Sequence, residues 1–300
     1  MYSELAAILA ASMPHEDDAV KLADVLYERC YTHSILDPWP PAESASDEDL
    51  TAVLMAANRS RPTWDEGWRV DQLLDHGRIL ARKNGAARSF LPGEYLTHRG
   101  LGAGPKAEKP VSIFLPAGSV EMQPDFYYAF GETAGEFEES ERTLRFYWNV
   151  SGEGAPHLME VLTRELNRFQ IAFLFKCGNR AAHYSRRDAA VLYVHARSYS
   201  IVALLMEQAY EHVETWLRPE TPLFVRPLAP GLGFAECPGE SFGKQRCRIL
   251  AEAMSATRGV AVDERMLAVR GQFERRGLSM EKPWLNAGSL DAYEFPLTVA

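Results

Sequence analysis

The stretch FKCGNRAAHYSRRDAAVLYV, from Phe175 to Val194, guides the interpretation of the whole sequence, because apolar segments enclose a basic middle. Apolar runs bounded by polar, turn-forming residues are typical of buried strands, so both ends are predicted to be strands. The segment between them holds Lys176, three arginines and Asp188. The chain as a whole has a formal net charge of −9, so this local positive charge indicates either an anionic ligand or a solvated loop.

The elements around this stretch predict an α+β fold. TLRFYWNV alternates as a half-buried strand does, and PHLMEVLTRELNRF has the spacing of an amphipathic helix. Residues 143–228, ending in the strand PLFVRPL, are predicted to run strand, helix, strand, strand, helix, strand, which is the order of a split β-α-β unit. A mixed β-sheet with helices packed on it would bury both helical stripes. The Gly- and Pro-rich LAPGLGFAECPGE is expected to be a loop, followed by helices at about 241–257 and 263–275.

The first 90 residues are predicted to form a helical N-terminal region, and residues 91–300 an α+β domain. Helical spacing covers YSELAAILAASM and DDAVKLADVLYERCYTH, and Ser46 is positioned to cap a third helix. The segment from Arg61 to Gly85 is interpreted as half linker and half helix. Further on, VSIFLPAG and FYYAFGE are expected to be strands.

Composition and motifs exclude several classes of protein. An acidic chain lacks the broad positive surface that a general nucleic-acid coat needs. The four cysteines have no metal-finger spacing, and no HExxH or Asp-rich motif is present, so no metal is expected. No apolar run approaches the ~18 residues of a membrane helix, and the N-terminus shows no signal pattern. We therefore expect a cytoplasmic protein without a membrane or nucleic-acid partner.

Lys176 and Asp188 are the first candidate site residues. Lys176 lies at the end of one predicted strand and Asp188 just before the next, with Arg186 and Arg187 nearby. A base held among arginines stays unprotonated more easily, and guanidinium groups bind phosphate through paired hydrogen bonds. The alternative is that Lys176 extends its amine into water at a sheet edge and that the arginines belong to a solvated loop.

The segment from Gly231 to Met254 is the second candidate, because a predicted helix starts at Ser241 among four glycines. Free backbone N–H groups at a helix start favour anions, and Lys244 and Arg246 place positive charge against the helix dipole. A solvent-exposed helix start explains the same residues without a ligand. His98 and His157 are candidate proton carriers, although a single histidine in such a place is more often structural.

Five segments of the sequence together resemble the HopA effector-like family: VSIFLPAG…FYYAFGE, RFYWNVSGEG, FLFKCG, HYSRRDAAVLYV and VRPLAPGLGFAECPGESFGKQRC. The resemblance covers roughly residues 90–257. It extends to the lyase component of class V lanthipeptide and thioamitide dehydration systems. In those systems a kinase-like partner phosphorylates Ser or Thr of a precursor peptide. The lyase then eliminates phosphate to leave dehydroalanine or dehydrobutyrine.

The resemblance implies a role for each candidate residue. Lys176 would remove the α-proton of the phosphorylated residue, and Asp188 would orient an arginine. Tyr184, Tyr193 or a histidine would protonate the leaving oxygen. Phosphate would be bound by Arg186, Arg226, Lys244 and Arg246, and the peptide by Arg99, Arg145, Asn149 and Ser241. Arg187 is expected to be ordinary surface, and neither a metal nor an organic cofactor is implied.

Two other functions remain open at this point. The protein could be a non-catalytic phosphopeptide-binding partner or scaffold of the kinase, or a HopA-type virulence effector. A titratable base within the basic cluster, Lys176, favours the lyase. The acidic segments 43–49 and 132–141 would suit docking of a basic kinase surface, although a solvated surface explains them as well.

Overall fold

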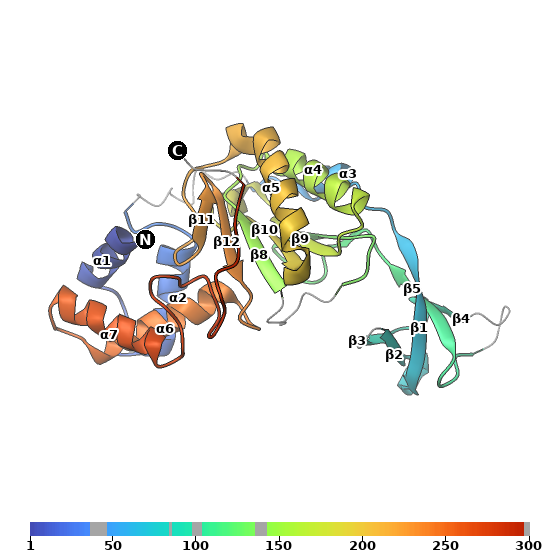
Figure 1. Ribbon diagram of the computed structural model, residues 1–300, viewed down its shortest axis with the longest axis horizontal. Coiled ribbons are helices and arrows are strands. Elements are labelled where there is room, and N and C mark those ends of the chain that lie inside the picture. The colour runs from blue at the N-terminus through green and yellow to red at the C-terminus, as the bar shows by residue number, and fades with distance from the viewer. Residues whose placement is uncertain (37–46, 84–85, 98–103, 136–142, 297–300) are drawn as a thin grey trace.

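Two antiparallel sheets and the helices around the larger one make up the fold (Figure 1). The computed structural model describes residues 1–36, 47–83, 86–97, 104–135 and 143–296. Figure 1 shows a central sheet flanked by helices, and a smaller sheet that stands to one side of it. We call this smaller sheet, residues 63–115, the β-lobe.

The central sheet has the strand order β11-β12-β8-β10-β9-β7-β6, and every pairing among the described residues is antiparallel. Its strands are β6 (Gly118–Ser119), β7 (Phe126–Phe130), β8 (Thr143–Trp148), β9 (Phe173–Gly178), β10 (Ala190–His195), β11 (Arg226–Ala229) and β12 (Leu232–Glu236). The predicted α+β class is confirmed, but these strands do not form the mixed sheet that we expected.

The helices α4 (Ala155–Arg168) and α5 (Tyr199–Val213) cover one face of this sheet, as the split β-α-β pattern predicts. They pack on Phe146, Leu192 and Phe175, which lie in one cross-strand row and are fully buried. The fourth strand of the unit is β12, whose sequence LGFAE we interpreted as part of a loop. Glycines flank and interrupt this strand because the chain approaches other segments there: Gly231 has a φ of +76° and lies against the Arg218 carbonyl.

Helices from both ends of the chain cover the opposite face. They are α1 (Tyr2–Ala10), α2 (Ala19–Leu26), the π-helical turn η1 (Tyr27–Tyr31), α6 (Phe242–Ala256) and α7 (Val262–Glu274). Arg187 binds the first of these to the sheet: its guanidinium contacts the Glu4 carboxylate at 3.0 Å. Arg187 is only 7% exposed, so the expectation of an ordinary surface arginine is wrong. A buried ion pair between α1 and the β9–β10 connection needs both partners, since either charge alone would be costly to bury.

The remaining helical elements are short. Helix α3 (Thr51–Ala57) packs on the α4 side, and the 3₁₀ turns are η3 (Asp75–Gly77), η4 (Ala181–Ser185), η5 (Ala196–Ser198) and η6 (Glu214–Trp216). The predicted cap of α3, Ser46, lies outside the described residues. The Asp49 carboxylate instead accepts a hydrogen bond from the Thr51 backbone N–H at 2.8 Å.

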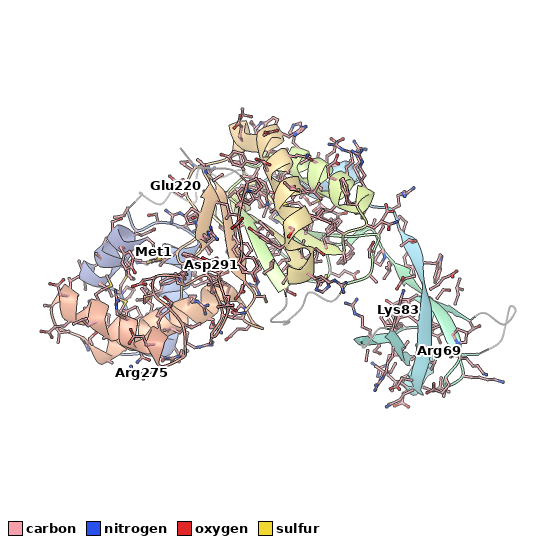
Figure 2. All side chains as sticks on the ribbon, viewed as in Figure 1. Met1, Arg69, Lys83, Glu220, Arg275 and Asp291 are labelled. Atoms are coloured by element: carbon pink, nitrogen blue, oxygen red, sulfur yellow. The ribbon has the colours of Figure 1, made fainter. Side chains whose placement is uncertain are left out.

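The β-lobe corrects our interpretation of residues 61–85 as linker and helix. Its strands are β1 (Thr63–Leu73), β2 (Ile79–Lys83), β3 (Ala86–Phe90), β4 (Tyr95–Thr97) and β5 (Pro110–Leu115), in the order β3-β2-β1-β5-β4. Trp68 and Val70 alternate into its small core, which is the spacing of a strand. Residue 90, our expected domain boundary, falls inside this sheet. Arg69 and Lys83 mark the lobe in Figure 2.

Replacing Gly243 with alanine is expected to destabilise the protein, because an added Cβ would collide with the Tyr31 ring. Overpacking costs about 1–3 kcal/mol of unfolding free energy, more than the roughly 0.5–1 kcal/mol that alanine gains over glycine in a helix. Gly271→Ala in α7 is the matched control, since its added Cβ would meet only the end of Arg275, at 3.9 Å. Urea unfolding compares the two, and equal stability of both variants would contradict the packing described.

Candidate functional site

The register of three neighbouring strands places Lys176, Tyr193 and Arg145 on the same face of the central sheet. Tyr193 of β10 lies directly opposite Arg145 of β8. Lys176 of β9 lies opposite Val191, two residues along from Tyr193. Directly paired residues and residues two apart project to one face. This surface, which we call the Lys176 face, is the one opposite α4 and α5.

Lys176 is half-buried on this face and rests on an aromatic ring. Its Nζ lies 4.3 Å from the centre of the Phe126 ring. Within the described parts of the chain, Lys176 makes no ion pair. A lysine amine that lacks a carboxylate partner is available to a ligand. Phe126 was not among our candidates, because the segment FYYAFGE around it indicated a strand and nothing about a binding site.

Asp188 orients Arg186, as we expected. The guanidinium donates from Nε to one carboxylate oxygen at 2.8 Å and from Nη2 to the other at 3.1 Å. Burial alone would lower the pKa of the Arg186 guanidinium, but the Asp188 carboxylate outweighs it and raises the pKa above its ordinary value. This paired geometry fixes the position of Arg186 and compensates much of its charge.

The π-helical turn η1 brings Tyr27 to the same place. The Tyr27 hydroxyl accepts a hydrogen bond from Arg186 Nη2 at 3.2 Å, and its ring lies 5.8 Å from both the Arg186 guanidinium and the Lys244 amine. Burial, followed by the Asp188 carboxylate, raises the pKa of the Tyr27 hydroxyl well above its ordinary value. π-helical turns are rare in proteins as a whole, and those that occur are often found at functional sites. Sequence reasoning missed Tyr27 because the helical pattern around it shows no sign of the irregular turn.

The start of α6 borders the Lys176 face. Arg145 Nη2 donates to the Glu240 carbonyl at 2.7 Å and to Cys237 Sγ at 3.0 Å. Ser241 occupies the N-cap position and is exposed, and its side chain makes no capping hydrogen bond. Lys244 is exposed in the first turn. Of the predicted residues, the structure thus brings Lys176, Tyr193, Arg186, Asp188, Arg145, Lys244 and Ser241 to one side of the sheet.

Two predicted site residues are instead committed to other parts of the fold. Tyr184 is buried in the core beneath α4 and α5, and its hydroxyl donates to the Gly178 carbonyl at 2.7 Å. Arg226 is paired with Phe234, which belongs to that same core. Its guanidinium binds Asp291, labelled in Figure 2, at 3.2 Å. Neither side chain is presented on the Lys176 face.

Two further predicted site residues donate hydrogen bonds to the backbone of loops. Arg246 is fully buried and donates to the Pro283 and Leu285 carbonyls at 2.9 and 3.0 Å, and burial lowers its pKa to about 10. The Asn149 amide donates to the Glu220 carbonyl at 3.0 Å. Arg99 and His98 lie outside the described residues.

His183, in the turn that follows β9, was not among the histidines that we named as proton carriers. Its ring stacks on Phe126, with centres 6.4 Å apart, so both side chains contact the same aromatic ring. Burial is the main cause that lowers the pKa of His183. His157 stacks instead on Trp216 at 4.3 Å, which is a structural contact.

Comparison with known proteins places the chain in a family. Residues 117–285 match the HopA1 effector protein family, more than half of the chain, and the protein belongs to that family. The structure is similar to that of the effector protein from Pseudomonas syringae pv. tomato strain DC3000, with a TM-score of 0.53, 17% identity and coverage of 95% of each chain.

A second similar structure is the effector protein from Pseudomonas syringae pv. syringae strain 61. It has a TM-score of 0.50 and 16% identity, with coverage of 96% of this chain and 99% of that one. At these identities the likeness is one of fold. No curated protein matches the sequence.

The described part of the chain contains no cluster of three or more His, Cys, Asp or Glu placed to hold a metal ion. All four cysteines are buried and free. None of the helices within the described ranges is long and apolar enough to cross a membrane.

The lowered pKa of His183 predicts a pH dependence of stability. Its folded-state pKa lies below the ordinary 6.5, so the unfolded chain binds the proton more readily. This contribution to the unfolding free energy is therefore fully present above about pH 7 and is lost as the pH falls below 6.5 toward the lowered folded-state pKa. NMR titration of the wild-type protein should give a His183 pKa below 6.5. As the pH is lowered, the unfolding free energy of His183→Gln should fall less steeply than that of the wild-type protein. A measured pKa above 6.5 would contradict the burial described.

Proposed function

We propose that the protein is a phospho-Ser/Thr lyase, which eliminates phosphate from a kinase-phosphorylated precursor peptide in lanthipeptide or thioamitide biosynthesis. The observation that supports this proposal most is Lys176, an amine without an ionic partner among the described residues, on one sheet face with Tyr193 and Arg145. The HopA1 family membership is consistent with it. The proposal includes a kinase-like partner protein and the precursor peptide.

Elimination requires a base for the α-proton and an acid for the leaving oxygen. The Lys176 amine takes the proton from Cα, the Cα electrons form the Cα=Cβ bond, and the Cβ–O bond breaks to release phosphate. To Tyr193, which is half-buried on the neighbouring strand, we assign the protonation of the leaving oxygen. The products are dehydroalanine or dehydrobutyrine and inorganic phosphate.

The charges around Lys176 suit a leaving group that gains negative charge. Arg186 is held in place by Asp188, and Arg186 and Lys244 both lie against the Tyr27 ring. Positive groups fixed before the reaction stabilise developing charge without reorganising during it. Asp188 itself is only 7% exposed and is occupied by Arg186, so we assign it to positioning.

Lys176→Ala should reduce phosphate elimination from a phosphothreonine peptide by about 100-fold or more, since a general base contributes roughly 10²–10⁴-fold. Mass spectrometry of the peptide after incubation with purified protein measures the loss of phosphoric acid. Lys109→Ala in the exposed part of the β-lobe is the matched control and should retain the full rate. Lys176→Arg, which keeps the charge but is too basic to take the proton, should be as inactive as the alanine variant.

Two results would reject parts of this proposal. Elimination by Lys176→Ala at the native rate would remove Lys176 as the base. Binding of phosphopeptide by the wild-type protein without any elimination, with or without a kinase-like partner, would favour the non-catalytic alternative.

A further inference from the structure

Arg145 differs from the other buried arginines of the described chain in how its guanidinium is satisfied. Arg187 pairs with Glu4 at 3.0 Å, and Arg265 pairs with Glu16 at 3.2 Å although its Nε, like that of Arg145, has no hydrogen-bond partner within the described residues. Arg246 lacks a carboxylate, but each of its three guanidinium nitrogens contacts an oxygen, from Pro283, Leu285 and Gln245.

Arg145 is 9% exposed and has neither kind of compensation. Among the described residues, only its Nη2 donates hydrogen bonds of good geometry, to the Glu240 carbonyl and to Cys237 Sγ, and the Tyr147 hydroxyl lies close to its guanidinium. Its Nε is buried and has no hydrogen-bond partner in the described structure. The neighbouring Glu240 carboxylate is directed to Arg248, at 2.7 Å, and to Gln245, at 3.0 Å. A buried cation with unmatched donors is unfavourable unless an anion completes it.

Two tyrosines next to Arg145 add further donors. The Arg145 guanidinium lies 5.2 Å from the centre of the Tyr193 ring. The Tyr147 hydroxyl, on a residue only 3% exposed, lies near Arg145 and Tyr31, and within the described residues it has no hydrogen bond of good geometry. A phosphate oxygen accepts hydrogen bonds from both kinds of group, so an anion here would satisfy donors that the protein itself leaves unmatched.

We infer that Arg145, together with Tyr147 and Tyr193, is the main binding site for the phosphate monoester of the substrate peptide. This inference rests on the proposed function, and it assigns to Arg145 the role that the sequence indicated for Arg186. Arg186 already donates two hydrogen bonds to Asp188, so it contributes positive charge and holds Tyr27.

The strand register relates the phosphate site at Arg145 to the proposed base, Lys176, and the proposed acid, Tyr193. Arg145 and Lys176 lie two strands apart and two residues out of register, about 12 Å between backbones, with the Tyr193 side chain between them. The Arg145 guanidinium already lies over the Tyr193 ring, whereas the Lys176 amine rests on Phe126 of β7 and would have to turn toward Tyr193 when the substrate binds. A phosphate bound at Arg145 therefore places the adjacent Cα on the side of Lys176 and the leaving oxygen beside the Tyr193 hydroxyl.

The first test uses the wild-type protein and inorganic phosphate. In ¹⁵N-arginine-labelled protein, the Nε–H resonance of Arg145, assigned with Arg145→Lys, should shift on titration with phosphate. A phosphate-dependent shift at Arg186 that leaves Arg145 unmoved would overturn the inference. The titration itself is done on the wild-type protein. The Arg145→Lys variant serves only to assign the resonance.

The second test measures peptide affinity in the Lys176→Ala background, where the phosphopeptide is not consumed. Arg145→Gln should lower the affinity for a phosphothreonine peptide by roughly tenfold or more while leaving that for the unphosphorylated peptide unchanged. A merely structural role would lower both affinities together or neither. Arg197→Gln, at an exposed arginine after β10, is the matched control and should change neither.

The outcomes separate this inference from the proposed lyase. Phosphate-specific binding at Arg145 without elimination by the wild-type protein would reject the lyase and retain the anion site. Elimination by the wild-type protein with phosphopeptide affinity that is insensitive to Arg145→Gln would retain the lyase and reject the site.

Discussion

The register of the antiparallel strands β8, β10 and β9 is the constraint on which the site depends. In one cross-strand row Phe146, Leu192 and Phe175 enter the core beneath α4 and α5, and in the adjacent row Arg145 and Tyr193 face the other way. A slip of one residue would exchange the two faces and place Lys176 in that core. Because the apolar row strongly disfavours such a slip, core packing also determines which polar groups meet on the Lys176 face.

The N-terminal helices complete this face rather than forming a separate unit. The adjacent arginines of SRRD act in different ways: Arg187 binds Glu4 of α1 in a buried pair, and Arg186 points toward Tyr27 and Asp188. The Arg187 backbone N–H also donates to the Thr32 carbonyl at 2.7 Å. The connection between β9 and β10 therefore holds η1 against the sheet, which places the Tyr27 ring next to both Arg186 and Lys244.

The sequence predicted those strands and helices whose apolar residues recur with the spacing of one type of element only. The alternation of TLRFYWNV gave β8 and placed Arg145 on the face opposite Phe146, although both faces of this strand are buried and not one alone as we expected, and the helical spacing gave α4 and α5. The spacing of VDQLLDHGRIL was misleading, because it fits a helix although Leu73 is 55% exposed at the end of β1. LGFAE was missed as a strand because Gly233 within it and Gly231 just before it, which permit close backbone approach, are typical of loops.

Candidate site residues could be predicted where they followed a strand pattern, as Lys176 and Arg145 do. The buried roles of Arg246 and Arg226 could not be predicted, because they depend on carbonyl and carboxylate partners 37 to 67 residues further along the chain. Tyr27 could not be predicted for the same reason: its position relative to Arg186, 159 residues away, exists only in the folded chain. A local pattern gives the face on which a side chain lies, but not the partner that it meets.

The central claim is that the Lys176 face removes an α-proton to expel phosphate. Incubation of the wild-type protein with a phosphothreonine peptide deuterated at Cα tests this most directly, with mass spectrometry of the product. The account predicts that every peptide that loses phosphate also loses its α-deuterium to solvent and becomes dehydrobutyrine. Release of phosphate from a peptide that retains the deuterium would indicate hydrolysis and contradict the account.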